Sequence, residues 1–216
     1  LLLDEPLGAL DARLRVELRY KLRDLVKEKK LTAIHVTHDQ EEALVVADRM
    51  IVLRNGKVQQ EGTPFNVYNE PQSIFVANFV GGANFLEGFI SQKDRRGSWV
   101  QLRNGLRVRI EETRHLLGER VVLVIREEMT PIIKRRKEGE GVNLMLGTVG
   151  MVSSLGSFMV YEVTLENGDQ VNSKVPTRLD EERIQIGEKV YVHLRPEHIR
   201  TYSYPPAGLY KELEAM

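Results

Sequence analysis

The sequence predicts two regions of different fold class, an α/β region at the N-terminus and an all-β region after it. The first 54 residues alternate strand-like and amphipathic helical stretches, the order of a parallel sheet covered by helices. After Gly81 and Gly82 the pattern changes to short β-rich runs separated by Asn-Gly turns. In this second region, residues 118–128 closely match residues 187–197, 69 positions later. A repeat of this kind indicates one architecture used twice.

The α/β region follows from apolar periodicity and from helix caps. Its expected elements are a strand at residues 1–3, a helix at 11–29, a strand at 31–37, a helix at 39–47 and a strand at 50–53. Asp11 and Asp39 are the expected N-caps. The opening strand is apolar without alternation, as in a strand buried on both faces. Because a central strand is not expected to open a domain, we expect this chain to be a fragment.

We place the first domain at residues 1–80. After residue 50 it is predicted to contain a hairpin and a helix. Arg54, Asn55 and Gly56 form the expected turn between strands at 50–53 and 57–60. Helical spacing around residues 72–80 precedes the two glycines, so we assign residues 81–83 to a linker.

The all-β domain is predicted at residues 84–203. Repeat one covers residues 84–134 and repeat two covers 142–203, and each has an Asn-Gly hairpin before its Gly-Glu strand. The tail, residues 204–216, has apolar side chains at helical spacing, which fits either a short docking helix or a frayed end.

Composition excludes several classes of protein. The 216 residues carry 31 basic and 31 acidic side chains and no Cys, so disulfides and thiolate metal sites are excluded. No apolar run is long enough to span a bilayer. The neutral balance and the 6% of aromatic residues favour no nucleic-acid partner. We expect Trp99, Tyr161 and Tyr191 to pack a core, and the basic run at residues 134–137 to be a solvated loop.

Three polar side chains follow the two predicted parallel strands. Asp4 and Glu5 come directly after the first strand, and His38 follows the second. Chemistry in parallel sheets collects at the carboxyl ends of the strands. One carboxylate there can hold Mg²⁺ and the other can orient or deprotonate a water, while the imidazole touches a phosphate. Each feature alone is more simply a polar turn, and we expect His35 to be an ordinary strand residue, not a metal ligand with His38.

The joint pattern resembles the back half of an ABC-transporter ATPase. The quoted stretches are Leu-Leu-Leu-Asp-Glu-Pro at residues 1–6, Gly-Ala-Leu-Asp at 8–11 and Val-Thr-His-Asp-Gln-Glu-Glu-Ala at 36–43. Asp4 and Glu5 are similar to the Walker B end, Asp11 closes a D-loop-like segment, and His38 is similar to the switch histidine. The resemblance extends to residue 80 and includes one small departure, Gly8, where Ser is common.

The resemblance implies roles for these residues and a set of partners. Asp4 would bind Mg²⁺ through water, Glu5 would be the base for water attacking the γ-phosphate of ATP, and His38 would contact that phosphate. Asp11 would shape the contact between two ATPase subunits. Such a subunit forms a homodimer or pairs with another ATPase subunit on the cytoplasmic face of the membrane. It works with transmembrane permease subunits and, indirectly, with an external solute-binding protein.

The phosphate loop Gly-x-x-x-x-Gly-Lys-Ser/Thr and the Leu-Ser-Gly-Gly-Gln signature are absent from the sequence. We therefore expect this chain alone neither to bind ATP tightly nor to hydrolyse it. The alternative interpretation is a non-catalytic dimerisation and regulatory module. A nucleic-acid-binding β-barrel is a third, less favoured one.

Residues 84–203 resemble the regulatory domain of such importers, which is built from oligomer-binding-like β-units. Gly147, Thr148 and Val149 open the second copy as in that family, and residues 194–197 close it. The first copy departs at Glu127, where the second has Pro196. The solute could be a sugar, a polyamine or an inorganic ion. Asn-Phe-Leu-Glu-Gly at residues 84–88 favours polyamine or ion importers by resemblance.

Overall fold

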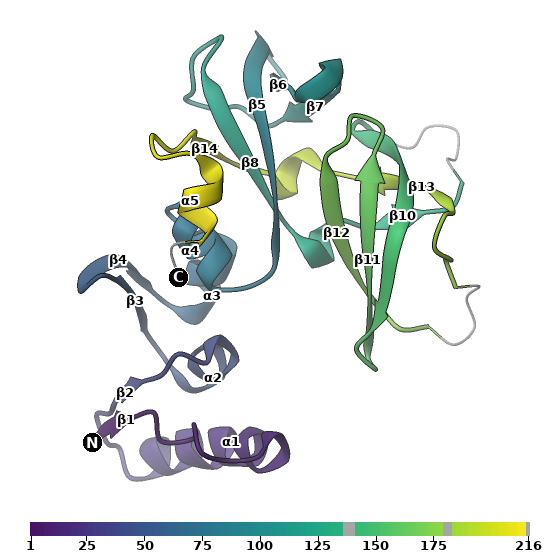
Figure 1. Cartoon of the computed structure of the whole chain (residues 1–216). Helices are drawn as coiled ribbons and strands as arrows, with labels where there is room; N and C mark the ends of the chain where they lie inside the picture. The colour runs from purple at the N-terminus through teal and green to yellow at the C-terminus, as the bar shows by residue number, and fades with distance from the viewer. Residues whose placement is uncertain (136–140, 179–182, 215–216) are drawn as a thin grey trace. The chain divides into compact units, whose positions relative to one another are not determined.

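The chain divides into two compact units in its computed structural model, which describes residues 1–135, 141–178 and 183–214 (Figure 1). The first unit comprises Leu1–Gly81 and the last residues from Leu213, and the second comprises Gly82–Glu212. Part of the basic run at 134–137 lies outside the described residues, as does part of the insertion that lengthens the second repeat.

The first unit contains two small sheets and four helices among its described residues. Its elements are β1 (Leu2–Asp4), α1 (Ala12–Glu28), β2 (Ile34–Val36), α2 (Gln40–Val46), β3 (Met50–Arg54), β4 (Lys57–Gly62), α3 (Pro64–Asn69) and α4 (Ile74–Phe79). β1 pairs with β2 in parallel, as predicted, whereas β3 pairs with β4 in a separate antiparallel sheet. The prediction that residues 50–53 extend the parallel sheet was therefore wrong, because the Asn-Gly turn folds β3 back onto β4 instead.

Side-chain caps begin each of the four helices. The carboxylates of Asp11 and Asp39 accept hydrogen bonds from the backbone N–H groups of Leu14 and Glu42, so both predicted N-caps are confirmed. The hydroxyls of Thr63 and Ser73 cap α3 and α4 in the same way. Each cap satisfies an N–H group that has no partner inside the helix. α3 is a helix that the periodicity did not predict.

The core of the first unit lies around β3, β4 and the two short helices. Its buried residues are Met50, Val52, Val67, Phe75, Val76 and Val80. The parallel pair is different, since Leu2 is 79% exposed and Ile34 is 61% exposed. The expectation that residues 1–3 form a strand buried on both faces is not met here, because a two-stranded sheet has too few neighbours to cover its own faces.

The second unit contains two five-stranded antiparallel sheets. The strands that belong to repeat one are β5 (Ala83–Asp94), β6 (Gly97–Gln101), β7 (Arg107–Ile110), β8 (Arg120–Arg126) and β9 (Ile132–Ile133). Those of repeat two are β10 (Leu144–Ser154), β11 (Phe158–Leu165), β12 (Gln170–Pro176), β13 (Lys189–His193) and β14 (Arg200–Ser203). The described residues of the tail form a short helix, α5 (Leu209–Glu214), and its docking role stays a prediction.

The two repeats exchange their last strands. The sheets have the orders β14-β8-β5-β6-β7 and β12-β11-β10-β13-β9, so β9 joins the strands of repeat two and β14 joins those of repeat one. Ile133 pairs with Tyr191, and Tyr202 pairs with Val122, so the two contacts are related by the same offset of 69 residues. Neither repeat completes a sheet of its own, and one buried cluster joins both sheets.

Two asparagines bind the repeats to each other in a matching way. The Asn84 side chain accepts from the backbone N–H of Asn172 (2.6 Å) and donates to its carbonyl (2.8 Å). The Asn143 side chain accepts from the N–H of Arg109 (2.6 Å) and donates to its carbonyl (2.6 Å). Arg109 and Asn172 occupy equivalent positions on β7 and β12, so each repeat clamps the edge strand of the other. Asn84 is the first residue of the stretch 84–88, which by resemblance favoured polyamine or ion importers. In the structure its side chain holds the two repeats together.

Candidate functional site

The ends of β1 and β2 bring the predicted catalytic residues to one edge of the parallel sheet. Asp4 is paired with Val36 in the register of the two strands. The next residue, Glu5, donates its backbone N–H to the Val36 carbonyl at 2.9 Å, which extends the pairing by one bond. His38 follows two positions later. Parallel pairing therefore places Glu5 and His38, 33 residues apart in sequence, side by side.

Glu5 and His38 are in direct contact. The Nδ1 of His38 lies 3.0 Å from the Oε1 of Glu5, and the two side chains are 75% and 53% exposed, His38 being the more open. The hydrogen bond to Glu5, together with the negative charge of that carboxylate, holds the pKa of His38 above its ordinary 6.5. The pair is open to solvent and can be reached by a ligand.

A small hollow of about 30 Å³ lies beside this pair. Its lining residues are Glu5, Gly8, Arg15, Thr37, His38, Asp39 and Glu42. The volume is enough for about one water, and the lining offers it several polar partners. A water in this position can be held by the Glu5 carboxylate, and this arrangement suits a general base.

A buried network fixes the loop that carries His38. Arg19 of α1 donates to the Asp39 carboxylate at 2.7 Å, and Arg15 reaches the same oxygen at 3.4 Å. Burial acts to raise the pKa of Asp39, but the Glu42 N–H and the Arg19 charge outweigh burial and hold that pKa below its ordinary value. Asp39 therefore stays ionised as a cap, and His38 precedes a well-anchored helix start.

Sequence reasoning missed these arginines. Arg15, Arg19 and Arg23 are spaced four residues apart on α1, so they lie on one side of the helix and face α2. Arg23 donates to the Val46 carbonyl at 2.7 Å, at the opposite end of α2 from Asp39. The four-residue spacing of these arginines could have predicted a charged face on the helix. The apolar residues of the same helix indicated a packing face instead.

Asp4 fits a magnesium ligand that acts through water. Its side chain is exposed and, within the described parts of the chain, has no hydrogen-bond or ion-pair partner. Magnesium keeps most of its waters and is commonly held by one or two carboxylates together with substrate phosphates. The described residues contain no cluster of three or more carboxylate and imidazole side chains able to hold a metal by themselves. A single carboxylate on the residue before Glu5 is consistent with that mode of binding, and Asp4 does not line the small hollow itself.

Asp11 and His35 lie outside the pair. The Asp11 carboxylate is exposed and caps α1 at 2.9 Å, which leaves its part in a subunit contact a prediction. His35 places its Nε2 2.6 Å from Glu42, whereas His38 faces Glu5, so the two imidazoles contact different carboxylates.

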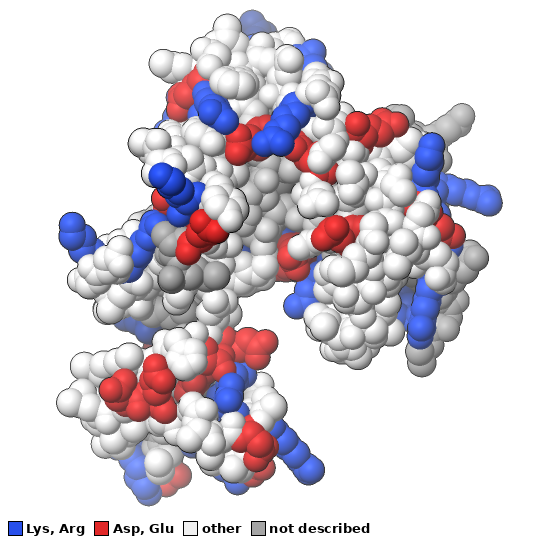
Figure 2. All heavy atoms as spheres, viewed as in Figure 1, with Lys and Arg blue, Asp and Glu red and all other residues white. Residues whose placement is uncertain are grey.

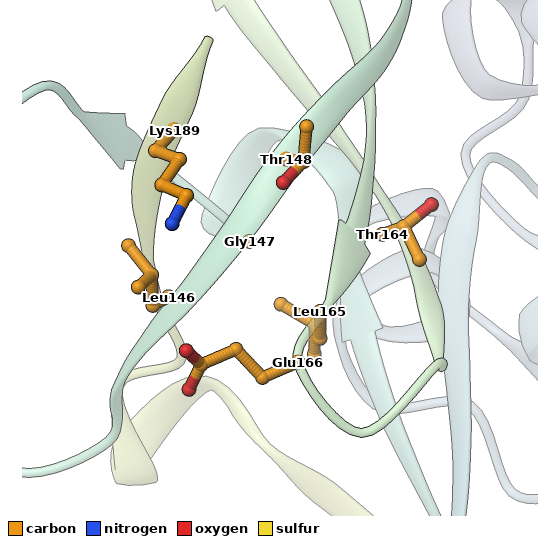
Figure 3. Close-up of a pocket in the computed structure, with 7 residues that line it drawn as sticks. All are labelled: Leu146, Gly147, Thr148, Thr164, Leu165, Glu166 and Lys189. Carbon is orange, nitrogen blue, oxygen red and sulfur yellow. The ribbon is translucent and has the colours of Figure 1, made fainter. Parts of the chain in front are cut away.

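A larger hollow of about 230 Å³ lies in repeat two (Figure 3). It is lined by Leu146, Gly147, Thr148, Thr164, Leu165, Glu166 and Lys189. In repeat one the positions that match Leu146 and Lys189 are Glu87 and Arg120, which form an ion pair at 2.7 Å. The hollow therefore lies where repeat two lacks that ion pair, and none of the predicted site residues lines it.

The TOBE domain family model matches residues 90–201, about half of the chain. The chain belongs to the TOBE domain family, and the predicted oligomer-binding-like fold of the all-β region is confirmed. None of the described helices is long and apolar enough to cross a membrane.

Several relatives that match the chain are named spermidine/putrescine import ATP-binding proteins. One from Pseudomonas fluorescens is 36% identical over 91% of this chain and 54% of its own length. One from Rubrobacter xylanophilus is 35% identical over 92% of this chain and 52% of its own length. One from Acetivibrio thermocellus is 55% identical over 43% of this chain and 26% of its own length. The chain thus spans about half the length, or less, of these relatives, and the predicted resemblance to ABC importer ATPase subunits is confirmed.

A solved structure shares the fold of the all-β region. The cytoplasmic molybdate-binding protein ModG, in a form with molybdate bound, aligns with a TM-score of 0.50 and 16% identity. The alignment covers 56% of this chain and 96% of ModG. At this identity the likeness concerns the fold alone.

Proposed function

We propose that this chain is the C-terminal part of the ATP-hydrolysing subunit of an ABC importer that energises polyamine uptake. The observation that carries the proposal is the Glu5–His38 contact of 3.0 Å beside a water-sized hollow at the carboxyl ends of two parallel strands. The relatives support it, since they carry both the import and the ATP-binding function in their names.

In this proposal the chain's own residues act on a water and a phosphate. The Glu5 carboxylate takes a proton from the water as the water oxygen attacks the γ-phosphorus of ATP, and the bond from that phosphorus to the bridging oxygen breaks so that ADP leaves. His38 gives a hydrogen bond to a γ-phosphate oxygen, which its Nε2 can do while Nδ1 faces Glu5. Asp4 would hold Mg²⁺ through water, and the ion neutralises charge on the phosphates when bound. Residues 1–80 contribute this chemistry and residues 84–203 the regulation.

The subunit would work in an assembly at the cytoplasmic face of the membrane. A homodimer, or a pair with a related ATPase subunit, would act on permease subunits, and Asp11 would lie at the subunit contact. Polyamine is preferred to sugar or inorganic ion because the matching relatives are named for spermidine and putrescine. By itself the chain lacks the phosphate loop, so we expect it to be inactive.

The test is ATP hydrolysis by the full-length subunit. Glu5→Gln keeps the size of the side chain but removes the base, so we expect the rate to fall at least about 100-fold. Glu17→Gln removes an exposed carboxylate whose partner among the described residues is Lys21 on α1, and should leave the rate unchanged. Hydrolysis by Glu5→Gln within a few-fold of the parent would favour the non-catalytic regulatory module. Uptake of labelled spermidine, set against a sugar and an inorganic anion, tests the solute.

A further inference from the structure

The neutral balance of the whole chain hides one strongly basic segment. Residues 92–109 contain six basic side chains and a single acidic one, Asp94. The matching segment of repeat two, residues 155–172, contains three acidic side chains and no basic one. Averages over each half of the sequence conceal this contrast.

The register of three strands places much of this charge on the outer face of one sheet. Val100 and Val108 point into the core, so their neighbours on β6 and β7 point outward. The outward residues form two cross-strand rows, Gln92, Trp99 and Arg109 in one and Phe89, Gln101 and Arg107 in the other. We call these six residues the cationic face. In Figure 2 several Lys and Arg side chains stand over the part that Figure 1 labels β5, β6 and β7.

Trp99 organises the two arginines of the face. The guanidinium carbons of Arg107 and Arg109 lie 5.1 Å and 5.2 Å from the centre of its ring, within the range of cation–π attraction. Asp94 balances the charge of Arg109 at 2.7 Å, whereas Arg107 is held by the neutral Gln92 at 2.9 Å. Within the part of the chain that the structure describes, no carboxylate is paired with Arg107. The expectation that Trp99 packs a core was wrong, since Trp99 lies on this outer face, half-buried.

The fold itself does not require these side chains. At the matching positions of repeat two, Glu162 stands for Trp99, Gln170 for Arg107 and Asn172 for Arg109. Thr148 takes the place of Phe89, which is 50% exposed. Two sheets of the same architecture thus differ on one face, where Trp99 and Arg109 pack against each other while Phe89 and Arg107 are exposed.

We propose that the cationic face binds single-stranded nucleic acid. β6 and β7 are the second and third strands of an oligomer-binding-like unit, and that face is where such units commonly take oligonucleotides. Phe89, which is 50% exposed, offers its ring for stacking on an unpaired base, and Arg107, whose guanidinium lies over the Trp99 ring, offers a charge-assisted bond to a phosphate. Arg95 and Arg96 at one hairpin tip extend the positive track along the strands, whereas Arg103 at the other turn is paired with Asp169 at 3.9 Å. This reverses the expectation drawn from whole-chain composition.

The only Trp of the chain reports on binding directly. We would titrate the full chain with a 12-nucleotide oligouridine at low salt and follow the fluorescence of Trp99. Saturable quenching is expected, with an affinity that falls steeply as salt rises, because each phosphate contact on a single strand contributes about −0.7 to the logarithmic salt slope. Arg107→Gln should weaken binding about 5- to 10-fold and reduce the slope by about 0.7, whereas Arg107→Lys should keep the slope.

Lys174→Gln is the matched control. Lys174 lies 5.0 Å from the ring centre of Phe158 on repeat two, so it is also a cation over an aromatic ring on a strand face. The Lys174→Gln variant should bind the oligouridine with the affinity of the parent chain. The proposal is overturned if the oligouridine leaves Trp99 unquenched at low salt, or if Arg107→Gln and Lys174→Gln lose equal affinity. Equal competition by polyglutamate of the same charge would also overturn it and would identify the face as a site for acidic protein segments.

Discussion

Glu5 adopts a φ of +43°, in the left-handed region that residues other than Gly, Asn and Asp seldom occupy. Its N–H still pairs with Val36, so the turn away from the sheet begins at this residue. The order of the residues predicted that Glu5 and His38 would meet at one sheet edge. Their direct contact could not be predicted, because it depends on this backbone angle and not on residue type.

The contact makes a prediction about protonation. In the parent chain, His38 should titrate above 6.5 in an NMR pH series, since the hydrogen bond to Glu5 favours the imidazolium. Because the pKa of His38 is raised in the folded chain, the pair contributes its full stabilisation at pH values below the ordinary His pKa of 6.5. That contribution is lost as the pH rises through the raised pKa. Glu5→Gln should bring the pKa of His38 back towards 6.5, whereas Asp4→Asn should leave it in place. If the pKa of His38 stayed the same in Glu5→Gln, the contact between His38 and Glu5 would not be its cause.

Gly88 and Gly147 show the same constraint in the two repeats. A Cβ at Gly88 would lie 2.5 Å from Val100 Cγ1 and 2.6 Å from the Gln101 carbonyl oxygen. A Cβ at Gly147 would lie 2.5 Å from Val163 Cγ1 and 2.9 Å from the Thr164 carbonyl oxygen. The long first strand of each repeat must therefore pass close to its neighbour, and only glycine permits this.

Gly88→Ala and Gly147→Ala should each lower the free energy of unfolding by about 1–3 kcal/mol, because the backbone carbonyl cannot move aside as a flexible side chain does. Urea denaturation measures the effect. Gly105→Ala is the contrast, since nothing lies within 4 Å of its Cβ and only its φ of +80° opposes the change, which should cost about 1 kcal/mol. Similar losses at all three positions would show that strain, not close approach, governs the strands.

The asparagine clamps allow a second test on the same elements. Asn84 is 5% exposed, and its amide satisfies the N–H and carbonyl of one edge-strand residue. Asn84→Ala should destabilise the fold by about 2–3 kcal/mol, since it leaves these groups unpaired in a buried place. Asn104 is exposed, and Asn104→Ala removes one part-buried hydrogen bond, to the Asn167 carbonyl, at a φ of +50°, so it should cost about 1 kcal/mol. Equal midpoints for the two variants would mean that the clamp contributes no more than an ordinary turn contact.

At the scale of the whole molecule, the repeat was readable but its assembly was not. The offset of 69 residues between the Gly-Glu strands indicated two copies of one unit, and the Asn-Gly turns located the hairpins. The exchange of β9 and β14 leaves no local signal, because a short strand pairs equally well with either copy of the same neighbour. The exposure of residues 1–3 could not be predicted either, because the burial of a parallel strand depends on elements that lie elsewhere in the fold.

Strand exchange predicts that both repeats unfold as one cooperative unit. Leu165 on β11 is 2% exposed and belongs to the buried cluster that joins the two sheets. Leu165→Ala should lower stability by about 2–5 kcal/mol, and Trp99, which lies in repeat one, should report the full loss in urea denaturation. Leu155→Ala changes an apolar side chain of repeat two that is 61% exposed and should leave the Trp99 midpoint within error. If Leu165→Ala lowers the urea midpoint measured by circular dichroism but not the midpoint measured by Trp99 fluorescence, the repeats fold separately. The exchanged strands then do not couple them. A common shift in both signals would instead show that the two sheets share one stability, as their interwoven strands require.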